Sequence, residues 1–368
     1  MSGSLALARA EANGVVDRTI ELCAIPAPTG QEGARAELVA SWWREDGWDD
    51  VRVDEVGNVW AGVPGRGERA ALVCAHLDTV LPADVIHGAR TDGDRLLGPG
   101  VGDDAVAVAS LSAVARSLAQ DAAPRLWLVA TVGEEGLGNL RGIRFALADV
   151  GGSVGAVLAI EGNYLGRVSA VGVGSLRWRV EARGPGGHAW EAARTPSAVH
   201  AIAAIASALG ALSHEGARTS ANVGMIGGGE AINARSRAAW LELDLRADDP
   251  AALDAMERRA REHIRDATPD AIDVEIRELG RRPAGRLDPG DPLVEAAAAS
   301  LTTLGIDPEF VATSTDANAA HAAGIPGVAI GITTGGDEHT PQEWILLEPI
   351  PLGLASVTGT IARWGETR

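Results

Sequence analysis

The 368-residue sequence is poor in cysteine and has no long apolar run. Its two cysteines, Cys23 and Cys74, are too few for the disulfide framework of a small secreted protein. No stretch approaches the roughly 20 consecutive apolar residues that a membrane-spanning helix requires. Residues 1–18 carry several charged side chains, so we expect no signal peptide there. Together these absences predict a cytoplasmic protein.

Positive charge is also scarce relative to negative charge. The chain has 32 lysine and arginine residues against 50 aspartate and glutamate residues, and its formal net charge is −18. A protein this acidic repels the phosphates of nucleic acids and anionic lipids. We therefore expect neither a nucleic acid nor a membrane as a partner.

Two glycine-based enzyme signatures are not formed. The sequence GGSVG at 151–155 has the G-x-S-x-G spacing, but it leads into a predicted strand instead of following one, so it is not the elbow of a serine hydrolase. The glycine-rich segment 98–104 offers a phosphate loop as one interpretation, but its spacing is not G-x-G-x-x-G. Asp103 and Asp104 in this segment would also repel a phosphate. A dinucleotide-dependent enzyme is therefore not favoured.

Length and hydropathy pattern predict an α/β protein of two domains. Domains usually contain about 100–200 residues, so a chain of this length suits two. Short apolar runs at 71–75, 126–131 and 154–160 are typical of buried parallel strands joined by crossover helices. We predict that residues 1–173 and 281–368 form a catalytic domain with a mostly parallel central sheet flanked by helices.

The pattern changes near Gly174, where apolar and charged residues begin to alternate. A period of two is typical of a strand with one face in water. Patterns of strand, helix, strand, strand, helix and strand then follow up to residue 280. This β-α-β-β-α-β order is the ferredoxin-like arrangement. We therefore predict that residues 174–280 form a separate, inserted domain.

Acidic and histidine side chains end three of the predicted strands. His76 and Asp78 end the first, Glu134 and Glu135 the second, and Glu161 the third. Each pair or residue alone has an ordinary explanation, such as a hydrogen-bonded loop or a solvated turn. Because open α/β sheets place their sites at the carboxyl ends of strands, we expect the three sets to share one edge. Adjacent glutamates repel unless a cation or proton compensates, which favours a site where one binds metal and the other acts as a base.

Three aspartates in these segments have open interpretations. His76 and Asp78 share a face of their strand, and a metal-bound histidine usually donates its second N–H to a carboxylate. We therefore expect Asp78 to orient His76, with a plain hydrogen-bonded loop as the alternative. Asp103 and Asp104 stand where a helix begins, and carboxylates stabilise such a position even without a ligand.

Seven motifs follow one another along the chain. They read HLDTV, GPGVGDD, TVGEEG, GPGGH, GGGEAINARSRAAWLELDLR, STDANAAHAAGIPGVAIG and EHTPQEW. In this order they resemble the zinc aminoacylase/carboxypeptidase family of metallopeptidases. That family includes peptidase T, the bacterial glutamate carboxypeptidase, succinyl-diaminopimelate desuccinylase and acetylornithine deacetylase. The resemblance extends from the turn at Gly57 to Trp344.

The resemblance implies a centre of two zinc ions, about 3.5–4 Å apart. It assigns His76 and Glu161 to one ion, and His339 and Glu135 to the other. Asp103 is then the carboxylate that bridges both ions. Cobalt or manganese would suit the same histidine and carboxylate ligands.

The resemblance also implies roles in catalysis. Glu134 would take a proton from a metal-bridging water, which attacks the amide carbonyl, and would then protonate the leaving amine. His188 in GPGGH would stabilise the oxyanion and, in dimeric relatives, reaches across from the partner subunit. Asn233 and Arg246 match positions that hold the backbone or carboxylate of the substrate. A turn histidine and a surface arginine are the ordinary alternatives for His188 and Arg246.

We therefore predict a dizinc hydrolase of peptide-type amide bonds. Its substrates would be di- or tripeptides, or N-acyl amino acids with a free carboxylate. The alternatives are a deacylase or desuccinylase of the same family, or a metal-binding homologue without catalysis, although Glu134 beside Glu135 argues for an enzyme. Glu161 is typical of carboxypeptidase- and deacylase-like relatives, whereas residues 214–233 resemble peptidase T, so the direction of cleavage stays open.

The inserted domain has a second expected role, as a lid and dimerisation domain. It offers an exposed strand edge and an alanine-rich helix, and both are natural dimer surfaces. By analogy with the family, we predict a homodimer through residues 174–280.

Overall fold

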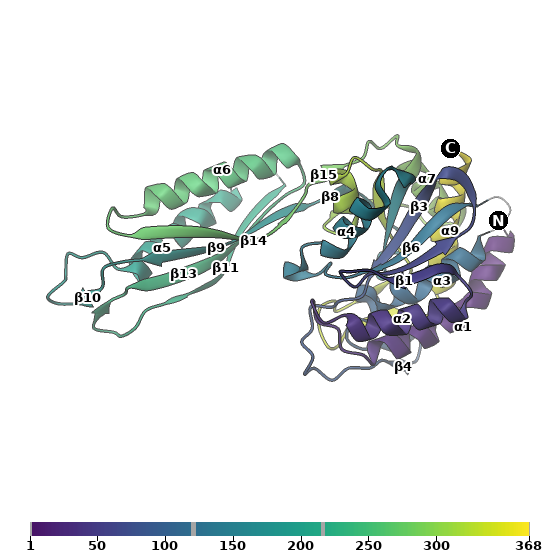
Figure 1. Cartoon of the computed structure of the whole chain (residues 1–368), viewed down its shortest axis with the longest axis horizontal. Helices are drawn as coiled ribbons and strands as arrows, with labels where there is room; N and C mark the ends of the chain where they lie inside the picture. The colour runs from purple at the N-terminus through teal and green to yellow at the C-terminus, as the bar shows by residue number, and fades with distance from the viewer. Residues whose placement is uncertain (1, 119–122, 215–217, 368) are drawn as a thin grey trace. The chain divides into compact units, whose positions relative to one another are not determined.

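The computed structural model describes residues 2–118, 123–214 and 218–367. Met1 and Arg368, the outer ends of the predicted catalytic domain, lie outside the described residues, as do 119–122 and 215–217. Contacts divide the chain into two compact units, shown in Figure 1. Unit 1 comprises Met1–Gly172 and Arg286–Arg368, and unit 2 comprises Val173–Gly285. The borders expected from the sequence, at residues 174 and 280, fall one and five residues inside unit 2.

Unit 1 is built on a nine-stranded sheet in the order β1-β2-β6-β3-β7-β17-β8-β15, with β16 paired to β8. Its central strands are β6 (Pro124–Thr131), β3 (Arg66–His76), β7 (Val154–Glu161) and β17 (Gly327–Gly331). These four run parallel to one another. The apolar runs at 71–75, 126–131 and 154–160 lie within β3, β6 and β7. The predicted α/β fold with a mostly parallel central sheet is therefore confirmed.

Shorter strands complete this unit. The large sheet also contains β1 (Asp49–Val53), β2 (Val59–Val63), β8 (Arg167–Gly172), β15 (Gly285–Arg286) and β16 (Glu309–Thr313). A four-stranded antiparallel sheet comprises β4 (Arg90–Asp92), β5 (Arg95–Leu97), β18 (Gly335–Gly336) and β19 (Trp344–Leu346). The chain between β18 and β19 of this small sheet contains His339.

Helices cover both faces of the large sheet. They are α1 (Ser2–Cys23), α2 (Gly33–Glu45), α3 (Val106–Ser117), α4 (Arg141–Val150), α7 (Pro292–Thr303), α8 (Ala317–Ala322) and α9 (Ile350–Glu366). Val73 and Ala75 of β3 pack in one core with α1, α2, α3, α7 and α9, while Leu72 and Cys74 pack in another with α4 and α8. Burial on both faces explains why these strands read as continuous apolar runs. In the part of the chain that the structure describes, no helix has the length and apolarity needed to cross a membrane.

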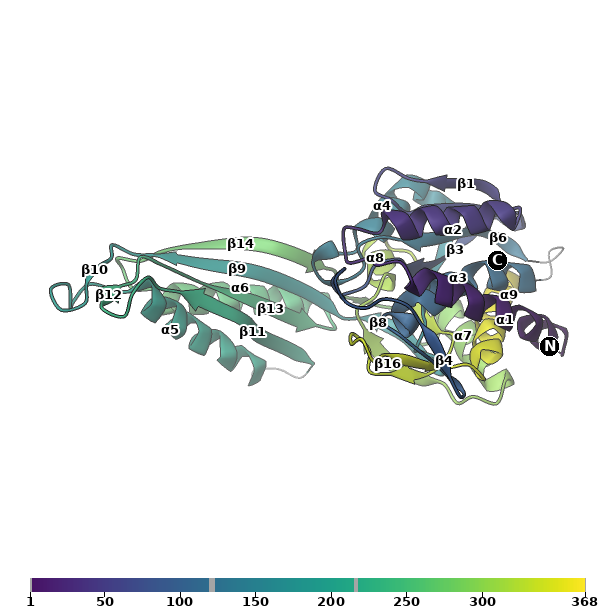
Figure 2. The same ribbon diagram turned by 90° about the horizontal axis from the view of Figure 1, so that it is seen from below.

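Unit 2 contains a four-stranded antiparallel sheet in the order β11-β13-β9-β14. Its elements are β9 (Gly174–Arg183), α5 (Ala198–Gly210), β11 (Thr219–Gly228), β13 (Ala238–Ala247), α6 (Pro250–Ala267) and β14 (Asp273–Arg282). This is the β-α-β-β-α-β order that the sequence predicts. Both helices lie along one face of the sheet, as Figure 2 shows, and the alternating apolar residues Trp178, Val180 and Leu243 form the core beneath them.

Candidate metal centre

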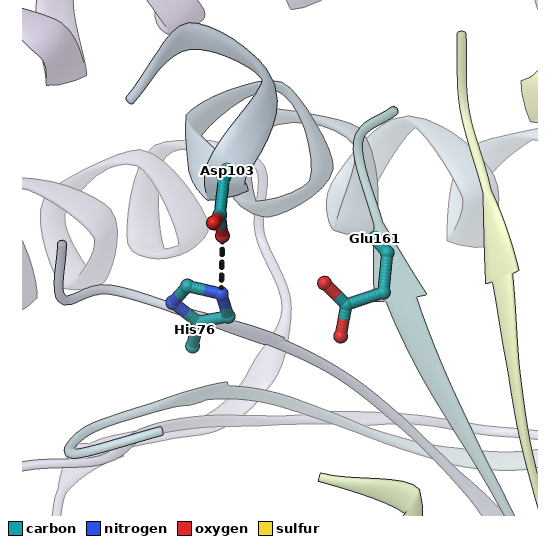
Figure 3. Close-up of side chains that lie close together, drawn as sticks. All are labelled: His76, Asp103 and Glu161. Carbon is teal, nitrogen blue, oxygen red and sulfur yellow. Dashed lines mark ion pairs between the residues drawn. The ribbon is translucent and has the colours of Figure 1, made fainter. Parts of the chain in front are cut away.

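The strands of the parallel sheet deliver the expected residues to one edge. His76 is the last residue of β3, and Glu161 is the last residue of β7. Glu134 and Glu135 follow the end of β6 after a short turn. Asp103 lies in the segment Val101–Ala105 that precedes α3, where its own backbone is not helical. Figure 3 shows His76, Asp103 and Glu161 facing one another across this edge.

Asp103 presents one carboxylate oxygen to each of two histidines. Its Oδ1 lies 2.9 Å from Nε2 of His76, and its Oδ2 lies 2.8 Å from Nε2 of His339. Glu135 completes the second side, because its Oε1 lies 3.5 Å from Nε2 of His339. A carboxylate whose oxygens face two different histidines is suited to bridge two cations.

The ligand atoms form two groups that share Asp103. In the first, atoms of His76, Asp103 and Glu161 lie within 4.8 Å of one another. In the second, the same holds for Asp103, Glu135 and His339. Imidazole nitrogen and carboxylate oxygen are donors that zinc, cobalt and manganese accept. The side chains therefore fit two divalent cations with Asp103 between them.

Without a cation, Glu135 and Glu161 bind a proton more readily than an ordinary carboxyl group, whereas the two histidines lower the pKa of Asp103. Burial raises the pKa of Glu161 well above its ordinary value, and the nearby Asp104 raises it further. Burial, and then the charge of Asp103, also raise the pKa of Glu135. Such shifts arise when carboxylates crowd together away from water. A divalent cation would displace these protons and relieve the repulsion.

The two histidines hold protons tightly in the same state. Burial by itself would lower the pKa of His76, but the hydrogen bond to Asp103 and the surrounding carboxylates raise it well above its ordinary value. Hydrogen bonds to Asp103 and Glu135 raise the pKa of His339 to about 11. In each contact a proton lies between the imidazole nitrogen and the carboxylate of Asp103, and a bound cation would replace it.

His339 has an unusual backbone conformation. Its φ is +63°, and Asp337 close by has a φ of +57°. Residues with a side chain rarely adopt this left-handed region, and when they do, the strain is often found at functional sites. The conformation turns the His339 imidazole towards Asp103.

The carboxylate of Asp78 orders the turn that carries the two glutamates. Its Oδ1 accepts the backbone N–H of Glu134 and its Oδ2 accepts that of Glu135, both at 3.0 Å. Thr29 donates its hydroxyl to Oδ2 at 2.9 Å. Nδ1 of His76 lies 3.0 Å from the main-chain oxygen of Asp78 but 3.7 Å from the carboxylate. Asp78 thus contacts His76 mainly through its main-chain carbonyl. Its carboxylate instead holds the backbone of Glu134 and Glu135, which the alternation of side chains along the strand did not predict.

Asp104 joins the ends of two strands rather than capping a helix. Its Oδ2 accepts the backbone N–H of His76 at 3.0 Å, and its Oδ1 accepts that of Gly162 at 2.9 Å. The side chain is fully buried. Burial raises its pKa well above the ordinary value. Because β3 and β7 end in His76 and Glu161, Asp104 fixes the spacing between two candidate ligands.

Two further buried carboxylates were missed by sequence reasoning. Glu343 accepts backbone N–H groups from the loop that carries Asp103. Burial and the charge of Asp103 raise its pKa to about 8, against the opposing effect of those hydrogen bonds. Glu32 accepts the N–H of Gly133 at 3.1 Å and pairs with Arg141 at 2.9 Å. The motif EHTPQEW contains Glu343. The spacing between His339 and Glu343 in this motif does not reveal that Glu343 contacts the loop that carries Asp103.

The expected residues of unit 2 do not all lie together. His188, in β10 (Gly187–His188), pairs with Ala234 of β12 (Ala234–Arg235), and Ala189 donates its N–H to the oxygen of Asn233 at 2.8 Å. His188 and Asn233 are therefore neighbours, and both are exposed. Arg246 lies near the other end of β13, about 25 Å along the strand from its start. There its Nε donates to Asp244 at 2.8 Å.

Comparison with known proteins places these observations in a family. The chain matches the family model described as peptidase family M20/M25/M40 over residues 72–363. A tripeptidase from Staphylococcus aureus subsp. aureus Mu50 has 21% sequence identity and a TM-score of 0.82, with 96% of this chain and 99% of that chain covered. Aminopeptidase PepT from Bacillus cereus has 21% identity and a TM-score of 0.80, with 96% and 98% covered.

A third structure is YxeP from Bacillus subtilis, described as a dinuclear metal binding peptidase from the M20 family. It has 18% identity and a TM-score of 0.72, with 98% of this chain and 99% of that chain covered. At these identities the structural likeness establishes the fold, while the family model spans most of the chain. The family resemblance predicted from the seven motifs is thereby confirmed. The chain belongs to peptidase family M20/M25/M40 and is a metal-dependent hydrolase.

Proposed function

We propose that this protein is a two-metal exopeptidase or amidohydrolase that opens peptide-type amide bonds of small substrates with a free carboxylate. The observation that carries the proposal is the shared carboxylate of Asp103, which belongs to both ligand groups. The structural neighbours described as a tripeptidase, an aminopeptidase and a dinuclear metal binding peptidase support peptides as substrates. N-acyl amino acids contain the same amide bond next to a carboxylate and are included in the proposal.

The two ligand groups define the proposed metal positions. We assign His76 and Glu161 to one ion, His339 and Glu135 to the other, and Asp103 to both. Zinc is the metal we favour, with cobalt and manganese as the alternatives that this donor set also accepts. When bound, the ions would polarise the scissile carbonyl and lower the pKa of the attacking water.

Glu134 is the proposed general base. Its side chain is buried, with 5% of the residue exposed, and its carboxylate lies within 4.8 Å of ligand atoms of His76 and Glu135. Asp78 fixes its backbone. From this place Glu134 accepts the proton of the attacking water and then delivers it to the leaving nitrogen. One carboxylate thus serves both proton transfers, and it must be ionised before the attack.

Metal analysis and one substitution test this function. Protein purified without chelator should contain about two zinc-like ions per chain. Glu134→Gln should keep these ions and lose turnover by about 10²–10⁴-fold, since the proton acceptor is gone. Glu55→Gln, at an exposed position, is the control with the same chemical change. Folded and active protein without metal would refute the proposal, and full turnover in Glu134→Gln would remove its role as base.

A hydrolysis screen separates the remaining candidates. Dipeptides, tripeptides and N-acyl amino acids should each be tested with zinc, cobalt and manganese. Release of the first or the last residue of a tripeptide defines the direction of cleavage. Hydrolysis of N-acyl amino acids alone would favour the deacylase or desuccinylase alternative. Metal binding without hydrolysis of any substrate would favour the non-catalytic homologue.

We also propose a homodimer that forms through unit 2. β11 is an edge strand of the sheet, and its Met225 and Ile226 are more than half exposed. An apolar strand edge offers unpaired backbone groups to a second copy of the chain. A single species at the monomer mass in sedimentation at working concentration would refute the dimer.

In the proposed dimer, His188 stabilises the oxyanion in the site of the other protomer. His188 stands where β9 ends and β14 begins, whereas the chain enters and leaves unit 2 at the opposite end of these strands. Its neighbour Asn233 is assigned to the substrate backbone, and Arg246 to the substrate carboxylate.

Mixing two inactive variants tests the action of His188 across the dimer. His188→Ala and Glu134→Gln should each have low activity alone. In a mixed dimer, one site combines an intact Glu134 with an intact His188 of the partner subunit, so activity should return. If mixing restores nothing although mixed dimers form, His188 acts within its own chain or has no role.

A further inference from the structure

We propose that Glu343 is a positioning residue for the metal centre. It holds the loop that carries Asp103 in its ligand conformation and ties this loop to the segment that carries His339. The inference rests on the proposed two-metal function, because it concerns the same centre.

The contacts of Glu343 are with the backbone of one loop. Its Oε2 accepts the N–H of Gly100 at 2.9 Å, and its Oε1 accepts those of Gly102 at 2.9 Å and Asp103 at 2.8 Å. Its own main-chain oxygen accepts the N–H of Gly98 at 2.9 Å. Residues 98–103 therefore wrap around a single side chain that is only 1% exposed.

The loop cannot take its shape from its own side chains, because glycine occupies three of its positions. The φ of Gly100 is +70°, and a Cβ there would lie 2.9 Å from Cγ2 of Thr79. A Cβ on Gly102 would lie 2.2 Å from Oδ1 of Asn163. Glycine permits this path but leaves the chain many other conformations. The three hydrogen bonds to Glu343 select one of them.

The two oxygens of a carboxyl group suit this task better than the single oxygen of an amide. Three backbone N–H donors converge on them, two on Oε1 and one on Oε2. Asn163 adds a longer contact, from Nδ2 to Oε1 at 3.5 Å. A glutamine at position 343 would have one acceptor oxygen, and its NH₂ group would face a backbone donor.

The position of Glu343 along the chain links its contacts with the Asp103 loop to both proposed metal positions. Glu343 follows His339 by four residues, and both lie in the segment between β18 and β19. The same segment thus supplies His339 to Oδ2 of Asp103 and supports the backbone N–H of Asp103. Because Asp103 faces both histidines, a shift of its loop should weaken both metal positions together.

Metal titration of Glu343→Gln tests this inference. Zinc affinity is measured by competition with a chromophoric chelator, and the two sites are followed by the visible absorption of bound cobalt. We expect both ions to bind about 10–100-fold more weakly, as is usual when a group that orients metal ligands is lost. Glu343→Asp keeps both oxygens but reaches less far, so its loss should be intermediate. Glu348→Gln, an exposed glutamate nearby, is the control with the same charge change.

The outcomes distinguish this inference from the function it rests on. Wild-type protein that binds no metal would overturn the proposed function and the inference with it. If wild type binds two ions, a folded Glu343→Gln with native affinity, or with loss at one ion only, overturns the inference alone. Circular dichroism of the metal-free variants shows which of them fold. If Glu343→Gln does not fold, native affinity in Glu343→Asp overturns the inference, and failure of both variants to fold would assign Glu343 to the fold instead.

Discussion

Among single residues, buried and half-buried carboxylates have two different uses in this protein. Asp103, Glu135 and Glu161 point at the histidines or into the centre between them. Asp78 and Asp104 instead accept backbone N–H groups of the residues that carry those ligands. The first set of carboxylates offers oxygens to a cation, and the second set fixes the positions of the proposed ligands. Both uses require burial, since a solvated carboxylate would exchange its partners for water.

A substitution of Asp78 tests whether a carboxylate that accepts backbone N–H groups fixes the positions of the proposed ligands. In Asp78→Asn one oxygen becomes an NH₂ group that faces the backbone N–H of Glu134 or Glu135. We expect metal affinity and turnover to fall by roughly 10–100-fold, because the turn loses its anchor. Metal titration and steady-state kinetics measure this, with the exposed Asp84→Asn as control. Native values in both measurements would show that the turn is held by other contacts.

Residue identity alone pointed to the proposed ligands but not to the carboxylates that support them. His76, Asp103 and His339 stand out in the sequence because their motifs resemble those of a known family. Asp104 and Glu343 lie in the same motifs, yet their function is to accept backbone N–H groups. Which N–H groups converge on a carboxylate depends on the path of the loops, and residue types do not encode that path directly.

At the scale of elements, the two periodicities of the sequence separate the two units. Continuous apolar runs became the buried parallel strands of unit 1, and alternating residues became the half-exposed strands of unit 2. Each unit encloses its own apolar core. Separate cores predict that damage to one unit leaves the other folded.

Trp178 of β9 tests this independence. The side chain is fully buried beneath the helices of unit 2, with the guanidinium of Arg261 4.5 Å from its ring centroid. Trp178→Ala should lower the free energy of unfolding of unit 2 by about 3–5 kcal/mol through the cavity it leaves. Urea denaturation followed by circular dichroism and by metal release should then show metal retained after unit 2 unfolds.

The control for this experiment lies in the same unit. Trp190 is 84% exposed, so Trp190→Ala should change the free energy of unfolding by less than about 0.5 kcal/mol. If metal release and unfolding coincide in Trp178→Ala as in wild type, the two units unfold as one.

For the whole molecule, the crowded charges make stability depend on pH and metal together. The raised pKa values of Glu135, Glu161 and Glu343 mean that the folded metal-free protein binds more protons than the unfolded chain between about pH 5 and 8. His339 acts in the same direction, since its stabilising proton is lost only as the pH rises through about 11. The lowered pKa of Asp103 takes effect only below its unfolded value of 3.8, outside this window.

The free energy of unfolding of the metal-free protein should therefore fall as the pH rises from 5 to 8. Metal affinity should rise over the same range, because cations displace the bound protons. Chemical denaturation in chelator and metal titration at each pH measure the two trends. Glu161→Gln removes one titrating group and should flatten the first trend. A metal-free protein that gains stability from pH 5 to 8 would contradict this assignment of protons.

The sequence by itself determined the α/β class, the β-α-β-β-α-β insertion and the family, together with the residues proposed as ligands. These follow from local signals in the sequence. The period of the apolar residues indicates which faces of a strand are buried, and each motif contains the residue types of the family at fixed positions. Only the tertiary structure decided that Asp103 faces both His76 and His339, and that Asp78, Asp104 and Glu343 hold the turns around them. It also placed Arg246 far along β13 from His188. Contacts between distant residues, such as that of Gly100 with Glu343 243 positions later, form only when strand ends and loops meet at one edge of a folded sheet.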